Sequence, residues 1–320
     1  MARVLTGWTL DLPAINTSLG SLFVPQRHDT GDKQLSHRFN NEVITNGGEN
    51  EYANLIDVIF EQDNVSKFIC RKFYRYFLNY EIDAEVEANI IEPMAQILRE
   101  DDYEVERALK TLLSSEHFYG EEVIGCMIKN PLDFVIASTK GLNLELSGDP
   151  ANDYFFSSVF YIFASELDMQ IFFHPDVAGW KAYYQEPQYY RNWINTFYLP
   201  SRNQTASSLV GGGPVNFLGN VAQVPQLINV VRYISTIDNA NDVNDLIFGI
   251  TSNLFSYPIS EAQKDFLKEI VIPGLPDFEW TVEYSEYLAD PFNPDKFNAI
   301  NNKLVALFKG ILEMPEYQLM

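Results

Sequence analysis

Residues 293–312, NPDKFNAINNKLVALFKGIL, decide the fold class of this chain. Asn293 can cap a helix N-terminus, and Pro294 suits the first helical position, where a proline loses no hydrogen bond. The apolar residues that follow recur every three or four positions: Phe297, Ile300, Leu304, Leu307, Phe308, Ile311 and Leu312. This spacing places them on one side of an α-helix. The segment therefore predicts an amphipathic helix that packs one face into a core.

Similar apolar spacing recurs after residue 50 and indicates further helices. Capping residues mark several of their starts, namely Asn64, Asp83, Asp102, Asn130 before Pro131, and Ser260 with Gln263 as a capping box. Other helical stretches are expected at 153–167, 189–198, 224–237 and 243–254. Together these segments predict an all-α, multi-helical globular array.

Three segments carry more specific expectations. Pro93 interrupts its helix and predicts a kink or two short helices, because proline removes an intrahelical donor. Residues 153–167 are apolar on nearly every side, which favours a helix buried all round at the centre of the core. Residues 200–219 are polar and glycine-rich, with a hinge-like glycine run at 211–213, and predict a mobile surface loop.

The chain divides into two parts on pattern alone. Residues 1–50 lack helical periodicity and contain several glycines and prolines, so they predict a loop-rich entry segment with short strands at most. Residues 51–320 predict a helical body. Because no long Pro/Ser linker crosses it, one continuous body is favoured, and the alternative is two subdomains that meet near 147–152.

The charge of the chain excludes several classes of partner. Among 320 residues, 22 Lys and Arg stand against 44 Asp and Glu, which gives a formal net charge of −22. So negative a surface repels phosphate backbones, and we expect no nucleic-acid partner. The 46% of hydrophobic residues suffices for a buried core. No apolar run approaches the ~18 residues of a membrane span, and the first residues, MARVLTGWTLDLP, show no export signal.

Cysteine count and motif spacing predict no metal and no cofactor. Cys70 and Cys126 cannot form a disulfide framework or a zinc site by themselves, and both lie among apolar residues. We expect two buried free thiols, with a single disulfide as the alternative. The glycine run at 211–213 lacks the Lys and Ser or Thr of a phosphate-binding loop, and no GxSxG motif occurs.

The first candidate site is the loop around His28 and Asp29, which also holds Asp32, Lys33 and His37. Imidazole and carboxylate groups serve as acid/base catalysts and as metal ligands, so His28 and Asp29 are the catalytic candidates. No metal-binding spacing accompanies them. The alternative is a structural network in which Asp29 holds His28 by a hydrogen bond.

The second candidate is the basic face formed by Lys67, Arg71, Lys72 and Arg75. Lys67, Arg71 and Arg75 recur every four residues and so line one side of a helix. Arg71, Lys72 and Arg75 are candidate binding residues for a carboxylate, phosphate or sulfate, because guanidinium groups donate paired hydrogen bonds to such anions. The alternative is neutralisation by neighbouring carboxylates, and it predicts that Arg71 and Arg75 are partly buried against them.

The third candidate is the aromatic segment 172–193, which holds Phe172, Phe173, Trp180, Tyr183, Tyr184, Tyr189, Tyr190 and Trp193. Exposed rings stack on sugar faces, and a nearby carboxylate such as Asp176 would suit a glycan. Asp176, Trp180 and Trp193 are therefore candidate glycan-binding residues. The alternative is that these rings build core or interface.

Several short segments together resemble a large bacterial family catalogued as a domain of unknown function, number 1800. They are LTGW at 5–8, His28-Asp29 with Gly31 and Lys33, FICRKFYRYF at 68–77, LKTLLSSEHFY at 109–119, KNPLDFVIAS at 129–138, MQIFFHPDVAGW at 169–180, WIN at 193–195 and MPEYQL at 314–319. The resemblance implies a mainly helical fold and a chain that corresponds to the later part of a longer family pattern. The chain departs from the family at His174, where a proline is usual, and at residues 181–184, where glycine-rich sequence is usual. The family supplies no activity to transfer.

The function expected from these observations is a binding or scaffold component of an exported or envelope-associated system, with an unknown protein or a glycan as its partner. Its export is inferred from the family resemblance; without an upstream signal the protein would be cytoplasmic. The alternative is a hydrolase acting on polysaccharide or another polymer, in a cleft formed by the His28 loop and residues 172–193.

Overall fold

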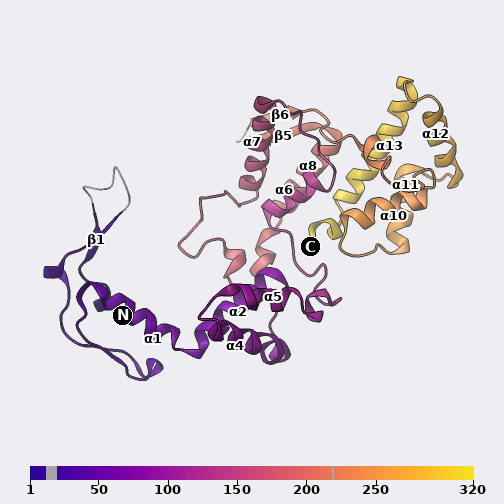
Figure 1. Ribbon diagram of the computed structural model, residues 1–320. Helices are drawn as coiled ribbons and strands as arrows, with labels where there is room; N and C mark the ends of the chain where they lie inside the picture. The colour runs from indigo at the N-terminus through magenta and orange to yellow at the C-terminus, as the bar shows by residue number, and fades with distance from the viewer. Residues whose placement is uncertain (12–19, 218–219) are drawn as a thin grey trace. The chain divides into compact units, whose positions relative to one another are not determined.

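The computed structural model describes residues 1–11, 20–217 and 220–320, and helices predominate in it (Figure 1). The all-α prediction is confirmed, since the only strands among the described residues form three two-stranded antiparallel ladders. The chain divides into two compact units. The first contains residues 1–77 and 81–118, and the second contains residues 78–80 and 119–320. The predicted boundary at 147–152 lies inside the second unit and includes the first residues of helix α7 (Pro150–Glu166).

The entry segment of the first unit is loop-rich, with short 3-10 turns and two small hairpins. Strand β1 (Trp8–Leu10) pairs with β2 (Ser21–Phe23), and β3 (Lys33–Gln34) pairs with β4 (Val43–Ile44). Helix α1 (Glu51–Phe60) follows. Val4, Leu35, Ile44 and Leu55 form a small core that joins these elements. Val4, Ile44 and Leu55 come from three different elements and Leu35 directly follows β3, so this core fastens the entry segment to α1.

The rest of the first unit is a group of helices around α4. Its elements are α2 (Asp63–Phe77), α3 (Ala84–Val86), a π-helical turn (Glu87–Ile91), α4 (Glu92–Glu100) and α5 (Val105–Leu113). The Asp83 carboxylate caps α3 at the Val86 N–H, as predicted. Pro93 lies in the first turn of α4, directly after the π-helical turn. Residues 84–100 stay helical throughout, and the wider π turn is the irregularity that accompanies Pro93.

The second unit packs its helices around α13 (Pro294–Leu312). Its other elements are α6 (Pro131–Lys140), α7 (Pro150–Glu166), α8 (Tyr198–Gly211), β5 (Gly213–Phe217), β6 (Asn220–Val224), α9 (Val230–Ile234), α10 (Val243–Leu254), α11 (Glu261–Val271) and α12 (Phe278–Ala289). The apolar face predicted for α13 is buried at Ile300, Leu304, Leu307 and Phe308. Asn293 caps this helix, and Ser260 with Gln263 forms the predicted capping box of α11.

The prediction of a surface loop at 200–219 is wrong. Residues 198–211 form α8, which packs against α13 and buries Ala206, Leu209 and Val210. The helix also buries polar residues, among them Thr205 and Ser208. Its polar composition therefore suggested a surface loop instead of a buried helix. Gly212 then turns the chain into β5 with a φ of 64°, and its backbone lies too close to Val224 and Gln226 for a side chain. Residues 218–219 lie outside the described residues.

The expectation that residues 153–167 are buried all round is also wrong. Helix α7 buries Val159, Phe163 and Ala164, while Tyr154 is 77% exposed and Phe155 57% exposed. An even distribution of apolar residues around a helix does not distinguish a central helix from one that leaves aromatic rings at the surface.

No helix of the described residues has both the length and the hydropathy that crossing a membrane requires.

Candidate functional site

Glu51, the first residue of α1, is the centre of a buried ion-pair cluster in the first unit. Its side chain is fully buried. His28 Nε2 lies 2.5 Å from Glu51 Oε2, and Lys33 Nζ lies 2.5 Å from Glu51 Oε1. Both partners come from the loop-rich segment before α1. The carboxylate therefore holds two points of the entry segment on the first turn of the helix.

The His28 ring is engaged on both nitrogens. Its Nδ1 lies 2.8 Å from the carbonyl oxygen of Thr6, on the side away from Glu51. The Phe23 ring packs beside it with ring centroids 5.3 Å apart, and the His28 side chain is only 2% exposed. An imidazole in this position has no ring nitrogen left for a substrate. His28 therefore links Thr6 to Glu51 in the first turn of α1.

Asp29 points outward instead of toward His28. Arg3 donates to both of its carboxylate oxygens, with Nε 2.6 Å from Oδ2, and the Gly31 N–H donates a third hydrogen bond of 2.9 Å. These donors, the Arg3 guanidinium first, hold the pKa of Asp29 well below its usual range. Asp29 is therefore ionised at neutral pH, which suits a structural anchor and not a proton donor.

The basic face of α2 is neutralised by the helical turns after it. Arg71 donates to both oxygens of Glu87, with Nε at 2.9 Å from Oε2, and this contact lowers the pKa of Glu87. Lys67 pairs with Glu92 at 2.7 Å. Arg71 is thus partly buried against a carboxylate, as the neutralisation alternative predicted, and Arg75 is half-buried. Lys72 is exposed, with Nζ 5.0 Å from the Phe68 ring centroid.

The aromatic segment 172–193 contributes to a small core of the second unit. Trp193 is 3% exposed and packs with Met169 and Ala182, so its ring offers no open face to a glycan. Trp180 is half-buried beside His174, with ring centroids 4.4 Å apart.

Asp176 is exposed and organises its own loop. Its Oδ2 accepts a 2.5 Å hydrogen bond from the Tyr184 hydroxyl, and its Oδ1 accepts one from the Ala178 N–H. These two donors, the hydroxyl first, lower the pKa of Asp176. Phe172 and Phe173 remain exposed on the same loop.

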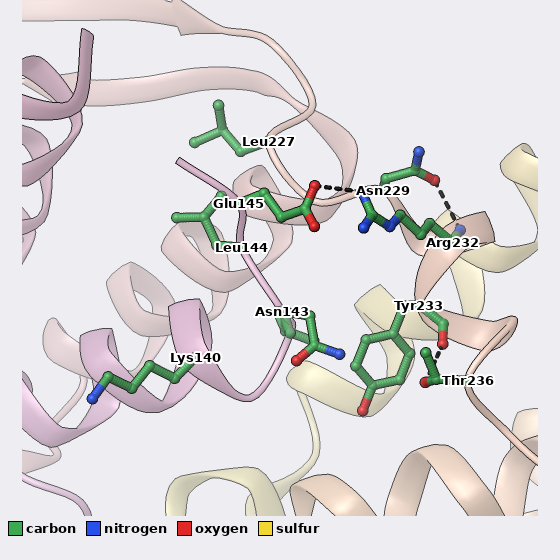
Figure 2. Close-up of a pocket in the computed structure, with 10 residues that line it drawn as sticks. Lys140, Asn143, Leu144, Glu145, Leu227, Asn229, Arg232, Tyr233 and Thr236 are labelled. Atoms are coloured by element: carbon green, nitrogen blue, oxygen red, sulfur yellow. Dashed lines mark hydrogen bonds and ion pairs between the residues drawn. The ribbon is translucent and has the colours of Figure 1, made fainter. Parts of the chain in front are cut away.

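A pocket of about 720 Å³ opens in the second unit between the end of α6, the chain that follows it, and α9 (Figure 2). It is lined by Lys140, Leu142, Asn143, Leu144, Glu145, Leu227, Asn229, Arg232, Tyr233 and Thr236. The guanidinium of Arg232 and the carboxylate of Glu145 form an exposed ion pair at its mouth, drawn as a dashed line in Figure 2. Among the described residues, no hydrogen bond engages the Asn143 amide.

Local geometry fixes the polar groups of this pocket. Asn229 caps α9, because its Oδ1 accepts the Arg232 N–H at 2.9 Å, and this places Arg232 in the first helical turn. Asn143 has a left-handed backbone with φ of 53°, in the turn that ends the α6 segment. Tyr233 lies beneath, 4% exposed, with its ring against Phe308. Burial raises the pKa of Tyr233, so its hydroxyl stays protonated at neutral pH.

The residues of this pocket were not among the sequence-based candidates. Asn143, Glu145 and Arg232 carry no motif, and they come from segments that the chain separates by more than eighty residues. Glu51 was missed in the same way, since only the fold brings it to His28 and Lys33. A charged residue at the start of an amphipathic helix is ordinarily solvated, and its sequence gave no signal of burial.

Cys70 and Cys126 are both free thiols, as predicted, but only Cys70 is buried and Cys126 is half-buried. In the described part of the chain, no three His, Cys, Asp or Glu side chains gather as a set of metal ligands.

These features define an all-α protein with one buried ion-pair cluster in its first unit and a polar pocket in its second. The chain belongs to the family described as Protein of unknown function (DUF1800), whose model matches residues 1–319. The match extends over essentially the whole chain and confirms the family resemblance. No curated protein and no solved structure is significantly similar to it.

Proposed function

We propose that this protein is a binding component, and that the pocket of its second unit holds the end of a neutral, polyhydroxylated ligand such as a glycan. The observation that carries the proposal is a cavity of about 720 Å³ lined by two amides, two hydroxyl groups and a self-neutralised ion pair. Small-molecule sites have volumes of roughly 300–1,000 Å³.

The charge of the pocket favours a neutral ligand. Arg232 and Glu145 neutralise each other, and the Lys140 side chain runs away from the other labelled side chains in Figure 2. The remaining polar groups offer both donors and acceptors, as hydroxyl groups require. Leu144 and Leu227 add apolar surface for the carbon face of a ring.

The state of His28 supports binding over hydrolysis. A general base must reach the proton that it removes, and both ring nitrogens of His28 are occupied by Thr6 and Glu51. The His28 loop belongs to the first unit and residues 172–193 belong to the second. A hydrolytic cleft formed by the two, and the setting of the protein in an exported or envelope-associated system, stay predictions.

The test is a glycan array followed by titration calorimetry with the best glycan. We expect Arg232→Met to weaken binding about tenfold or more, the effect of losing a hydrogen bond from a charged group, and Asn143→Gly to weaken it about two- to tenfold, the effect of losing a neutral one. Glycine at 143 keeps the left-handed backbone accessible. Arg107→Met, which removes two ion pairs at the surface of the first unit, is the matched control and should bind as wild type does.

Two results would contradict the proposal: no glycan binds the wild-type protein, or the pocket variants bind as tightly as Arg107→Met. Product analysis of the same mixtures tests the hydrolase alternative, with His28→Ala as its control. Glycan cleavage by the wild-type protein that His28→Ala abolishes would favour that alternative.

A further inference from the structure

Two buried cations of the second unit have no carboxylate partner. Arg202, in α8, is 0% exposed, and Lys129, two residues before α6, is 8% exposed. Among the described residues, no Asp or Glu oxygen lies within 4.0 Å of either charged group. Buried charges in proteins are ordinarily paired, because removing an isolated charge from water is costly. Two of them side by side therefore require an explanation.

The groups that contact these cations are neutral. The Arg202 guanidinium donates a 2.9 Å hydrogen bond to the carbonyl oxygen of Lys129 and lies over the Phe134 ring. Lys129 Nζ donates to the carbonyl oxygen of Tyr317 at 2.6 Å and lies over the Tyr317 ring. Burial lowers the pKa of Arg202 to about 10. Burial first, and then the charge of Arg202, lowers the pKa of Lys129 to about 8.

Asp133 is an acidic residue near enough to Lys129 to affect its pKa, but its carboxylate is hydrogen-bonded to Asn130. Its Oδ2 accepts a 2.5 Å hydrogen bond from the Asn130 side-chain amide. Burial raises the pKa of Asp133, which is the opposite of what a close ion pair with Lys129 would produce. One half-buried carboxylate beyond ion-pair distance cannot balance two buried cations.

Two buried donors on neighbouring side chains have no acceptor. Arg202 Nε and Gln318 Nε2 are both without a hydrogen-bond partner among the described residues. They belong to neighbouring side chains, since Arg202 also contacts Gln318 Oε1 at 3.5 Å. An unsatisfied buried donor costs roughly 1–3 kcal/mol, so native proteins rarely leave two together. A negatively charged hydrogen-bond acceptor would satisfy the two donors and would also compensate the buried positive charge.

The C-terminal segment covers this place. Lys129 N–H donates to the Gln318 carbonyl oxygen at 2.8 Å, and the Met320 N–H donates to the Met127 carbonyl oxygen at 2.9 Å. Ile128 and Leu319 form an isolated antiparallel bridge between these two hydrogen bonds. An acceptor bound at Arg202 and Gln318 would therefore be enclosed, and its binding would be linked to docking of the 315–320 segment.

We propose that the second unit binds one small monovalent anion of the halide class at Arg202 Nε and Gln318 Nε2, beside Lys129. Enclosure favours a small ion, because Gln318 is 2% exposed and Arg202 is 0% exposed. A single negative charge neutralises Arg202, the cation whose Nε would contact the anion. The anion is the counterion that joins α8 to the C-terminal segment.

Thermal unfolding in sodium chloride and in sodium gluconate at equal ionic strength tests this proposal. Gluconate screens charge equally but is too large for an enclosed halide site. We expect the unfolding midpoint of the second unit to rise with chloride and to level off, ending about 2–4 °C above its value in gluconate. Equal midpoints in the two salts would overturn the proposal.

Gln318→Glu is the sharpest variant, because it supplies a carboxylate where the anion would bind. We expect this protein to lose the chloride response and to be at least as stable in gluconate as the wild-type protein. Gln188→Glu, at an exposed position of the same unit, should keep the full response. A Gln318→Glu protein that responds to chloride as wild type does would contradict the inference.

Crystals grown in sodium bromide give a readout that is independent of stability. We expect an anomalous scattering peak within about 3.5 Å of Arg202 Nε, at hydrogen-bond distance for a halide. Ordered water without anomalous signal at that position would overturn the proposal.

Discussion

The Tyr317 hydroxyl donates a buried 2.8 Å hydrogen bond to Ser138 Oγ, across 179 residues of sequence. Ser138 Oγ in turn donates to the carbonyl oxygen of Phe134 at 2.8 Å, and the Phe134 ring packs edge-on against Tyr317. Burial raises the pKa of Tyr317 to about 12. This chain of contacts fixes the C-terminal turn to α6, so two of the segments that carry the family resemblance meet in one place.

Tyr317→Phe should destabilise the second unit by about 0.5–1.5 kcal/mol, because it removes one buried hydrogen bond while Ser138 keeps its bond to Phe134. Urea unfolding measures the loss. In a double-mutant cycle, Ser138→Ala should remove most of the effect of Tyr317→Phe, since the two side chains share the bond. Additive effects of the two substitutions would contradict this account.

Glu51→Gln should destabilise the first unit by about 3–5 kcal/mol, because it leaves the Lys33 ammonium buried without a counter-charge. Hydrogen exchange should show earlier opening of the entry segment and of the first turn of α1. Glu49→Gln, at an exposed position two residues earlier, is the control and should change stability by less than about 0.5 kcal/mol. Similar stability of the two variants would show that the cluster does not hold the segment.

The lowered pKa of Lys129 predicts that the unfolding free energy of the protein rises with pH in chloride-free buffer. Its pKa is about 8 in the folded protein against 10.5 for an unperturbed lysine, so between these values the unfolded state binds more protons. The buried Lys129 charge lowers the unfolding free energy by its full amount below pH 8, and this effect disappears as the pH rises toward 10.5. The unfolding free energy of wild type relative to Lys129→Met should therefore increase between pH 8 and 10, by at most about 1.4 kcal/mol per pH unit.

Urea unfolding at several pH values measures this difference, with Lys181→Met at an exposed position as the control. A difference between wild type and Lys129→Met that stays constant from pH 7 to 10 would exclude the lowered pKa.

Cys70 should resist thiol reagents in the folded protein. Its side chain is fully buried, and burial raises its pKa to about 11 from 9.0. The reactive thiolate is therefore about 100-fold rarer at pH 8 than in an unfolded chain. Mass spectrometry after iodoacetamide treatment should find Cys70 unmodified until urea unfolds the first unit. Modification of Cys70 under native conditions at the rate of a free thiol would contradict its burial.

The helices that sequence patterns identified best are those with a clear start and one apolar face. Asn130 before Pro131, and Asn293 before Pro294, cap α6 and α13 in the structure. Both signals are local: a side-chain oxygen accepts the N–H groups of its own first turn, and the apolar spacing is a property of one helix. Such features need no information about the rest of the fold.

The misjudged helices are those whose surroundings decide their burial. Helix α8 contains Arg202 and Thr205 at buried positions, so its composition suggested a surface loop. Helix α7 exposes Tyr154 and Phe155, so its composition suggested a central position. In both cases the neighbouring helices determine which residues are covered, and a single segment does not specify its neighbours.

The candidate sites divide in the same way. His28, Asp29 and Arg71 were identified from residue type, yet the partners that define their chemistry are Glu51, Arg3 and Glu87. The pocket of the second unit had no sequence signal, because its amides and its ion pair belong to segments that are ordinary when considered separately.

The amino-acid sequence by itself determined the helical class, the caps of α6, α11 and α13, the acidic charge and the family of this protein, because each depends on local spacing or composition. Only the tertiary structure decided which charges are buried and which remain in water. Burial is a property of the space between elements, and Glu51 meets His28, or Arg202 meets Gln318, only after the chain has folded.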